Sequence, residues 1–183
     1  MDTIRYFRDL AKADLRGART SGDAVFGLQQ VQHQVAVDAG YRSWSALLTA
    51  DETDRQIAVV MDLEPQLNLF GFGPGSFARS AQERRENFAQ WRIELRASGE
   101  HVEEIRQWLE RNVEPRRTIN SHAGSYGLKH IAEQALGEYV ANGEFIAAAI
   151  IAGYPYRREA EGSPNARFGM SERSINALRN TRA

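Results

Sequence analysis

The segment Phe145–Ala152, with the sequence FIAAAIIA, restricts the possible folds of this chain more than any other. It is apolar at every position, and Glu144 precedes it while Gly153 and Pro155 follow it. A helix that is apolar on all faces is a buried helix, and its alanines allow neighbouring elements to approach closely. Eight residues are too few to cross a membrane. The sequence therefore predicts that this segment is the centre of a core.

A second helix is predicted immediately before this segment. Ser125 is a candidate N-cap, and Gly137 is a candidate stop in the left-handed conformation. Between them, apolar residues recur at spacings of three and four, which is typical of one face of an amphipathic helix. The pair Asn142-Gly143 predicts a turn before Phe145.

The remaining segments also indicate helices, so the predicted fold is all-α. Residues 1–64 are expected to form an N-terminal bundle of three or four helices, with Asp23 as an N-cap, Gly40 as a stop and a short helix after Ser43. Residues 65–79 are expected to be a glycine-rich connector, and 80–183 a larger helical domain. The segment 67–77, LNLFGFGPGSF, is expected to be extended or irregular, and 162–169, GSPNARFG, to be a loop.

Composition excludes several kinds of chemistry. The chain has no cysteine, which excludes disulfides, thiolate metal sites and cysteine nucleophiles. The net charge of −1 provides no overall basic field for nucleic acid. No secretory signal is recognisable at the N-terminus, so we expect a cytoplasmic protein without a membrane partner.

The sequence offers no catalytic set, and we expect no metal and no cofactor. Two pairs, His101/Glu104 and His130/Glu133, have His-x-x-Glu spacing, whereas helical carboxylate-bridged metal sites use Glu-x-x-His. No G-x-S-x-G nucleophile elbow is present. A metal-dependent enzyme that uses His101, His122 and His130 is the third alternative.

The first functional hypothesis is a non-enzymatic protein that binds nucleic acid, for example duplex DNA. The apolar Phe145–Ala152 helix cannot be a reading helix, so the contacts must come from basic residues beside it. The candidates are Arg116, Arg117, Lys129, His130, Arg157, Arg158, Arg167 and Arg173.

The second hypothesis is a protein that binds another protein, such as an inhibitor or adaptor acting on a host nuclease complex. The acidic stretch 51–64 could imitate phosphate toward a basic partner, and the apolar loop 67–77 could provide further contacts. The candidate residues are Asp51, Glu52, Asp54, Asp62, Glu64, Phe70 and Phe72.

Three short sequence segments indicate a genetic context that is compatible with either hypothesis. SYGLKHIAE, NGEFIAAAIIAGY and SPNARF-x-x-SERSI resemble uncharacterised proteins carried on bacterial mobile elements such as plasmids, prophages and integrative elements. The likeness covers Pro115 to Ile175. The resemblance implies an accessory of a mobile element: a DNA-associated factor, a regulator or an inhibitor of a host defence system.

Overall fold

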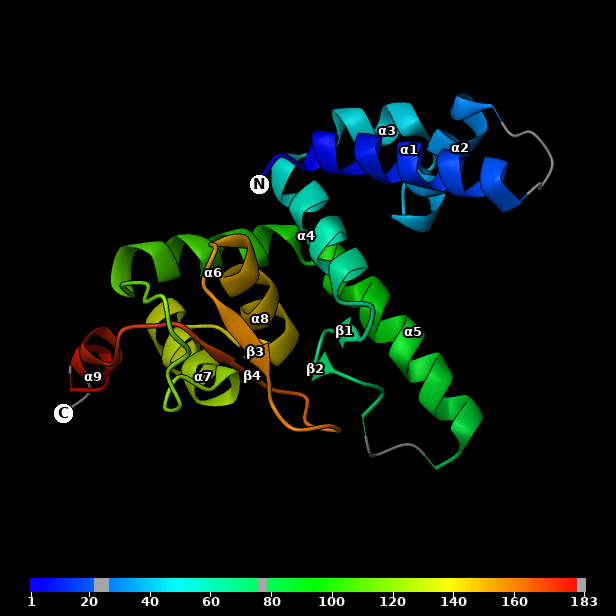
Figure 1. Ribbon diagram of the computed structural model, residues 1–183. Coiled ribbons are helices and arrows are strands. Elements are labelled where there is room, and N and C mark those ends of the chain that lie inside the picture. The colour runs from blue at the N-terminus through cyan, green and yellow to red at the C-terminus, as the bar shows by residue number, and fades with distance from the viewer. Residues whose placement is uncertain (22–26, 76–78, 181–183) are drawn as a thin grey trace. The chain divides into compact units, whose positions relative to one another are not determined.

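The computed structural model describes residues 1–21, 27–75 and 79–180 and divides the chain into two compact units, Met1–Leu63 and Glu64–Ala183 (Figure 1). The described residues form helices and two small β-hairpins, which confirms the all-α prediction. The predicted connector 65–79 belongs to the second unit. Within the described ranges, no helix has the length and apolar character that a membrane crossing requires.

The first unit contains the helices α1 (Thr3–Ser21), α2 (Leu28–Asp38), α3 (Trp44–Thr49) and α4 (Glu52–Leu63). The predicted short helix after Ser43 is α3, and the Ser43 hydroxyl caps it by accepting a hydrogen bond of 3.1 Å from the Ala46 amide. Gly40 has the predicted left-handed conformation, with φ of 85°. The predicted cap Asp23 lies outside the described residues. The core consists of Phe7, Ala11, Val35, Ala36, Tyr41, Leu47, Ala58 and Val59.

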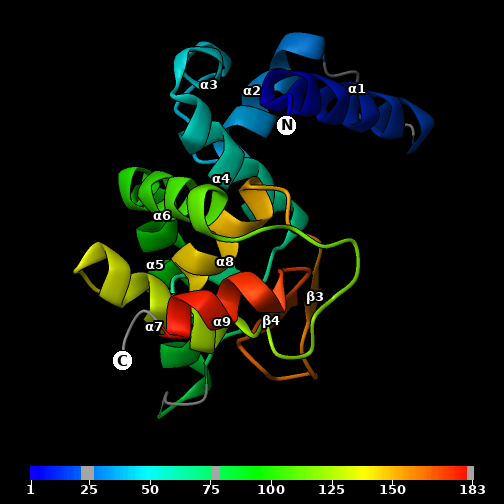
Figure 2. The ribbon, with the colours of Figure 1, turned by 90° about the vertical axis from the view of Figure 1, so that its left-hand side faces the viewer.

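The second unit is built around α8 (Asn142–Ile151), which lies between α6 and α7 in both views (Figures 1 and 2). The other helices are α5 (Ala81–Ala97), α6 (Gly99–Asn112), α7 (Ser125–Leu136) and α9 (Glu172–Asn180). Residues 145–149 are fully buried, as predicted, whereas residues 150–152 at the end of the predicted core segment are half-buried.

Helix α8 begins three residues earlier than predicted, because Asn142 and Gly143 form its first turn rather than a free turn. The Glu144 carboxylate accepts a hydrogen bond of 2.8 Å from the Ala141 amide and stabilises this start. The Gly143 amide donates to the Leu69 carbonyl at 2.8 Å. A Cβ atom on Gly143 would lie 1.9 Å from the Asn68 carbonyl oxygen, so only glycine fits here.

The predicted extended segment forms the antiparallel hairpin β1 (Leu67–Asn68) and β2 (Gly71–Phe72). A second hairpin pairs β3 (Tyr156–Arg158) with β4 (Ala166–Phe168). The prediction that 162–169 is a loop throughout was therefore wrong. Phe168 is buried against Phe145, with ring centroids 6.0 Å apart, and this tertiary packing outweighs the local loop signals.

The role predicted for Ser125 was also wrong. Gly124 is the N-cap of α7, and Ser125 is the buried first residue of the helix. Its hydroxyl accepts a hydrogen bond of 3.2 Å from the Ala166 amide and so attaches α7 to β4. Gly137 ends α7 in the left-handed conformation, as predicted, with φ of 80°.

Candidate functional site

A groove of about 800 Å³ lies in the second unit beside the β1–β2 hairpin. One wall consists of Phe70, Phe72 and the 73–75 segment, with Trp91 from α5. A second wall is Arg158 with residues 159–164, which lie between β3 and β4. Its volume lies within the range of roughly 300–1,000 Å³ that is usual for binding pockets.

Hydrogen bonds fix the two walls to one another. The amide of Phe72 donates to the Pro164 carbonyl at 3.0 Å, and the Asn142 side-chain amide donates to the same oxygen at 3.0 Å. A Cβ atom on Gly71 would lie 2.1 Å from this carbonyl oxygen, so the close approach requires glycine. The start of α8 therefore anchors both walls, and the groove is preformed.

Trp91 is held against the first hairpin. Its carbonyl accepts a hydrogen bond of 3.1 Å from the Leu69 amide. Its ring meets the Phe70 ring edge-to-face at a centroid distance of 5.0 Å, a favoured aromatic geometry. The Phe70 side chain remains accessible, since the residue is 45% exposed. The groove thus presents aromatic surface to solvent.

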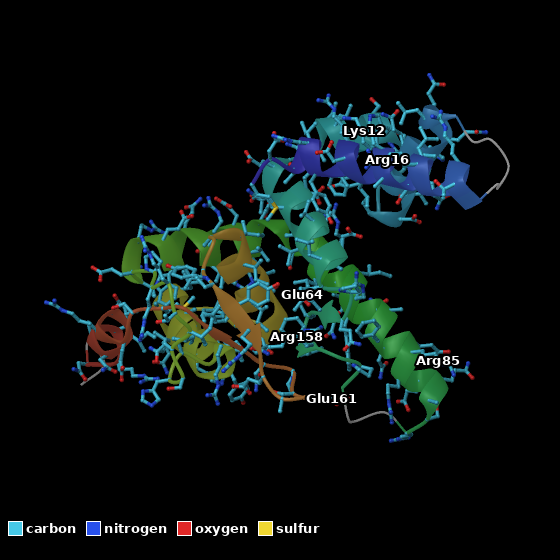
Figure 3. The ribbon with its side chains drawn as sticks, in the orientation of Figure 1. Lys12, Arg16, Glu64, Arg85, Arg158 and Glu161 are labelled. Carbon is cyan, nitrogen blue, oxygen red and sulfur yellow. The ribbon has the colours of Figure 1, made fainter. Side chains whose placement is uncertain are left out.

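Arg158 is the positioned cation of the groove (Figure 3). Its Cζ lies 4.2 Å from the centroid of the Phe72 ring, within the range of a cation–π contact. Its Nε forms an ion pair of 3.3 Å with Glu64 Oε2. The Tyr156 hydroxyl donates to Glu64 Oε1 at 2.6 Å. Burial, together with this carboxylate, raises the pKa of Tyr156, so the phenol remains a donor.

Glu159 is neutralised within its own loop. It forms an ion pair of 3.1 Å with Arg167 and accepts a hydrogen bond of 3.1 Å from Ser163. Burial would raise the pKa of Glu159, but the hydrogen bonds from Arg167 and Ser163 outweigh it, and the pKa is lowered. Glu161, at the exposed tip, adds a further carboxylate to the rim.

The predicted basic residues do not form one free surface. Lys129 is buried, with a side chain only 6% exposed, and it pairs with Glu133 at 2.7 Å. His130 contacts the same carboxylate. Arg158 and Arg167 pair with Glu64 and Glu159, as described above. Four of the eight predicted residues are thus engaged within the protein, and Lys129 is too buried to contact a phosphate backbone.

The other four are Arg116, Arg117, Arg157 and Arg173, which are exposed. They form no ion pair within the described part of the chain. Arg157 lies opposite Arg167 in the β3–β4 register, so their side chains emerge on the same face. The Arg116 amide donates to the Gly169 carbonyl at 2.8 Å, which places it next to β4. A smaller basic area therefore surrounds this hairpin.

Most of the predicted acidic surface supports the fold. Asp51 accepts from the Thr53 amide at 2.8 Å, Asp54 accepts from Tyr41 at 2.7 Å, and Asp62 accepts from Tyr6. Glu52 is exposed. These four residues belong to the first unit, whereas Glu64 and the two phenylalanines belong to the second. Phe72 is 5% exposed and lies beneath Arg158, so Phe70 is the accessible member of the pair.

The three histidines proposed for a metal enzyme contact different carboxylates. His101 pairs with Glu144 at 3.2 Å rather than with Glu104, and His122 pairs with Glu172 at 3.1 Å. His130 pairs with Glu133, its predicted neighbour. No group of three or more histidines or carboxylates suited to a metal occurs among the residues that the structure describes.

Sequence reasoning missed Trp91 and the Glu64–Arg158 pair as parts of a groove. The helical spacing of Trp91 with Phe88 and Leu95 predicts a core position, and this spacing does not indicate that the Trp91 ring is partly exposed.

Comparison of the chain with protein-family models, with curated proteins and with solved structures found no match.

Proposed function

We propose that this protein is a binding protein that holds a segment of a partner polypeptide in the groove beside the β1–β2 hairpin. The observation that carries the proposal is the groove itself, which combines the accessible rings of Phe70 and Trp91 with a positioned guanidinium. Aromatic residues and arginine are the types most enriched at the energetic centres of protein interfaces.

The rigidity of the groove supports this function. The Pro164 carbonyl accepts hydrogen bonds from the Phe72 amide and from the Asn142 side chain, and Asn142 is the first residue of the buried helix α8. A preformed groove loses little conformational entropy when it binds, so more of the contact energy appears as affinity. This proposal retains the apolar loop of the inhibitor or adaptor hypothesis. It does not require the acidic stretch 51–64.

The test is a selection of random peptides displayed with free carboxyl ends. We expect the protein to select a family of peptides, and Phe70→Asp to weaken their binding at least about tenfold by placing a charge on the apolar wall. Ile93→Asp is the matched control, because Ile93 is 63% exposed on α5 and does not line the groove. Failure to select any peptide, or equal binding by the Phe70 variant, would contradict the proposal.

A second candidate function is nucleic-acid binding beside the β3–β4 hairpin. The observation that favours it is the placement of two exposed arginines, Arg116 and Arg157, beside this hairpin. Each phosphate contact contributes about 0.9 to the slope of log affinity against log salt for duplex DNA.

We expect the double variant Arg116→Gln/Arg157→Gln to weaken binding to a labelled duplex and to reduce this slope. Arg85→Gln is the control, because Arg85 is an exposed arginine on α5 (Figure 3). Absence of duplex binding at low salt removes this candidate.

A further inference from the structure

We infer that Arg158 binds the C-terminal carboxylate of the partner polypeptide, and that the aromatic wall receives an apolar side chain on its last residue. This inference rests on the proposed function and specifies the ligand of the same groove. The groove is then a recognition site for the C-terminus of a polypeptide.

The Arg158 guanidinium has hydrogen-bond donors that are available to a ligand. Its Nε is used by Glu64, and the two terminal nitrogens form no hydrogen bond with any described residue. These nitrogens make a planar fork that matches the two oxygens of a carboxylate. Arg158 lines the groove, so a ligand within the groove can reach the fork.

The guanidinium is also held in place before a ligand arrives. Phe72 lies beneath it at 4.2 Å, Glu64 holds one edge, and the Tyr156 hydroxyl in turn holds Glu64. A charged group fixed by such neighbours loses less side-chain entropy when it binds. The arrangement differs in this respect from an exposed arginine that is free to move.

The local charge favours a carboxylate over a phosphate. Glu64 already offsets part of the Arg158 charge, and Glu161 adds a carboxylate to the rim, so a doubly charged group is opposed more strongly than a singly charged one. A carboxylate carries a single negative charge, which one guanidinium fork can match.

The apolar wall favours a chain end over an acidic side chain. The last residue of a polypeptide carries its carboxylate and its own side chain on the same Cα atom. The carboxylate can therefore pair with Arg158 while that side chain packs against Phe70 and Trp91, which line the same groove. Aspartate and glutamate side chains offer the charge without the adjoining apolar group.

The experiment is a titration of the full chain with N-acetylated hexapeptides that end in phenylalanine, monitored by ¹H–¹⁵N NMR. We expect shifts of the Arg158 Nε–H and Trp91 indole N–H signals, and binding weakened at least about tenfold when the peptide ends in a carboxamide. Arg158→Gln is expected to cause a similar loss. Arg158→Lys is expected to recover only part of the affinity, because it keeps the charge without the fork.

Arg85→Gln is the matched control, since Arg85 is an exposed arginine on α5 that does not line the groove. Thermal unfolding of each variant verifies that the fold is retained, and Arg158→Lys provides the decisive comparison if Arg158→Gln fails to fold. Equal binding of acid and amide peptides would overturn the inference while leaving the peptide groove intact. Binding of free 3-phenylpropionate as strong as that of the peptide would overturn the polypeptide source. Lack of any selected peptide would instead remove the proposed function.

Discussion

The Tyr156 hydroxyl donates a hydrogen bond of 2.6 Å to Glu64, a residue 92 positions earlier in the chain. This bond connects the β3–β4 hairpin to the segment that precedes the β1–β2 hairpin. We expect Tyr156→Phe to lower the free energy of unfolding by about 1.5–3 kcal/mol, because it removes one partly buried hydrogen bond to a charged group. Urea unfolding measures the change. Tyr139→Phe is the control, because Tyr139 is 64% exposed, and an equal effect of both variants would contradict this role.

The buried Lys129–Glu133 pair leads to a second prediction. Lys129 Nζ also donates to the Val140 carbonyl at 3.0 Å, and Glu133 accepts from the Val140 amide at 3.3 Å. We expect Lys129→Met to destabilise the protein by about 3 kcal/mol, since it leaves a largely buried carboxylate without its main partner. Lys12→Met is the exposed control. The double variant Lys129→Met/Glu133→Leu should recover part of the lost stability, because it also removes the carboxylate. Absence of any recovery would show that the stability loss in Lys129→Met comes from packing alone.

The same pair predicts a dependence of stability on pH. Burial would raise the pKa of Glu133, but hydrogen bonds from Lys129, His130 and the Val140 amide outweigh it and lower the pKa below its ordinary value of 4.5. The ionised carboxylate therefore contributes stability above pH 4.5, and this contribution is lost as the pH falls toward the lowered value. Urea unfolding from pH 7 to pH 3 should show a shallower acid loss for Glu133→Gln than for the unsubstituted chain. Parallel curves would contradict the prediction.

The close approach at Gly143 predicts opposite effects for two Gly→Ala substitutions. At Gly143, the added Cβ would overlap the Asn68 carbonyl, so we expect a loss of about 1–3 kcal/mol. At Gly127, on the exposed side of α7, nothing lies within 4 Å of the added atom. Gly127→Ala should therefore raise stability by about 0.5–1 kcal/mol through helix propensity. Thermal and urea unfolding of both variants check the sign of each effect.

The buried helix α8 predicts a large cavity effect. Phe145 is fully buried against Phe168, so we expect Phe145→Ala to cost about 3–5 kcal/mol. Ile93→Ala, at an exposed position, should change stability by less than about 0.5 kcal/mol. The urea midpoint of each variant measures the difference, and a small effect at Phe145 would place it outside the core.

The sequence predicted those elements whose signals are local. Gly137 ends α7 in the left-handed conformation with φ of 80°, as a glycine after the last apolar residue of a helical pattern predicts. Strand β4 was not predicted, because the bond between the Ala166 amide and Ser125 crosses 41 positions and leaves no periodic trace. The burial of Lys129 was also missed. Its environment depends on the Val140 carbonyl and on Tyr139, whose ring centroid lies 4.8 Å from Nζ.

The groove could not be predicted for a similar reason. Phe72, Trp91 and Arg158 come from three separate segments, and each has an ordinary local explanation. The second hypothesis placed partner contacts on the glycine-rich run 67–77, in which Phe70 is accessible whereas Phe72 is buried. Only the packing of that loop against Pro164 and Trp91 converts it into a shaped surface.

The hydrogen bond between the Gly143 amide and the Leu69 carbonyl has a consequence for any attempt to isolate the groove. The shape of the first hairpin is imposed by the start of the central helix, and a fragment that lacks α8 loses the partner that imposes it. Transplantation onto another scaffold would need the helix as well as the loop. Natural variation in length should accordingly concentrate at the 160–163 tip and spare the junction of Leu69 with Gly143.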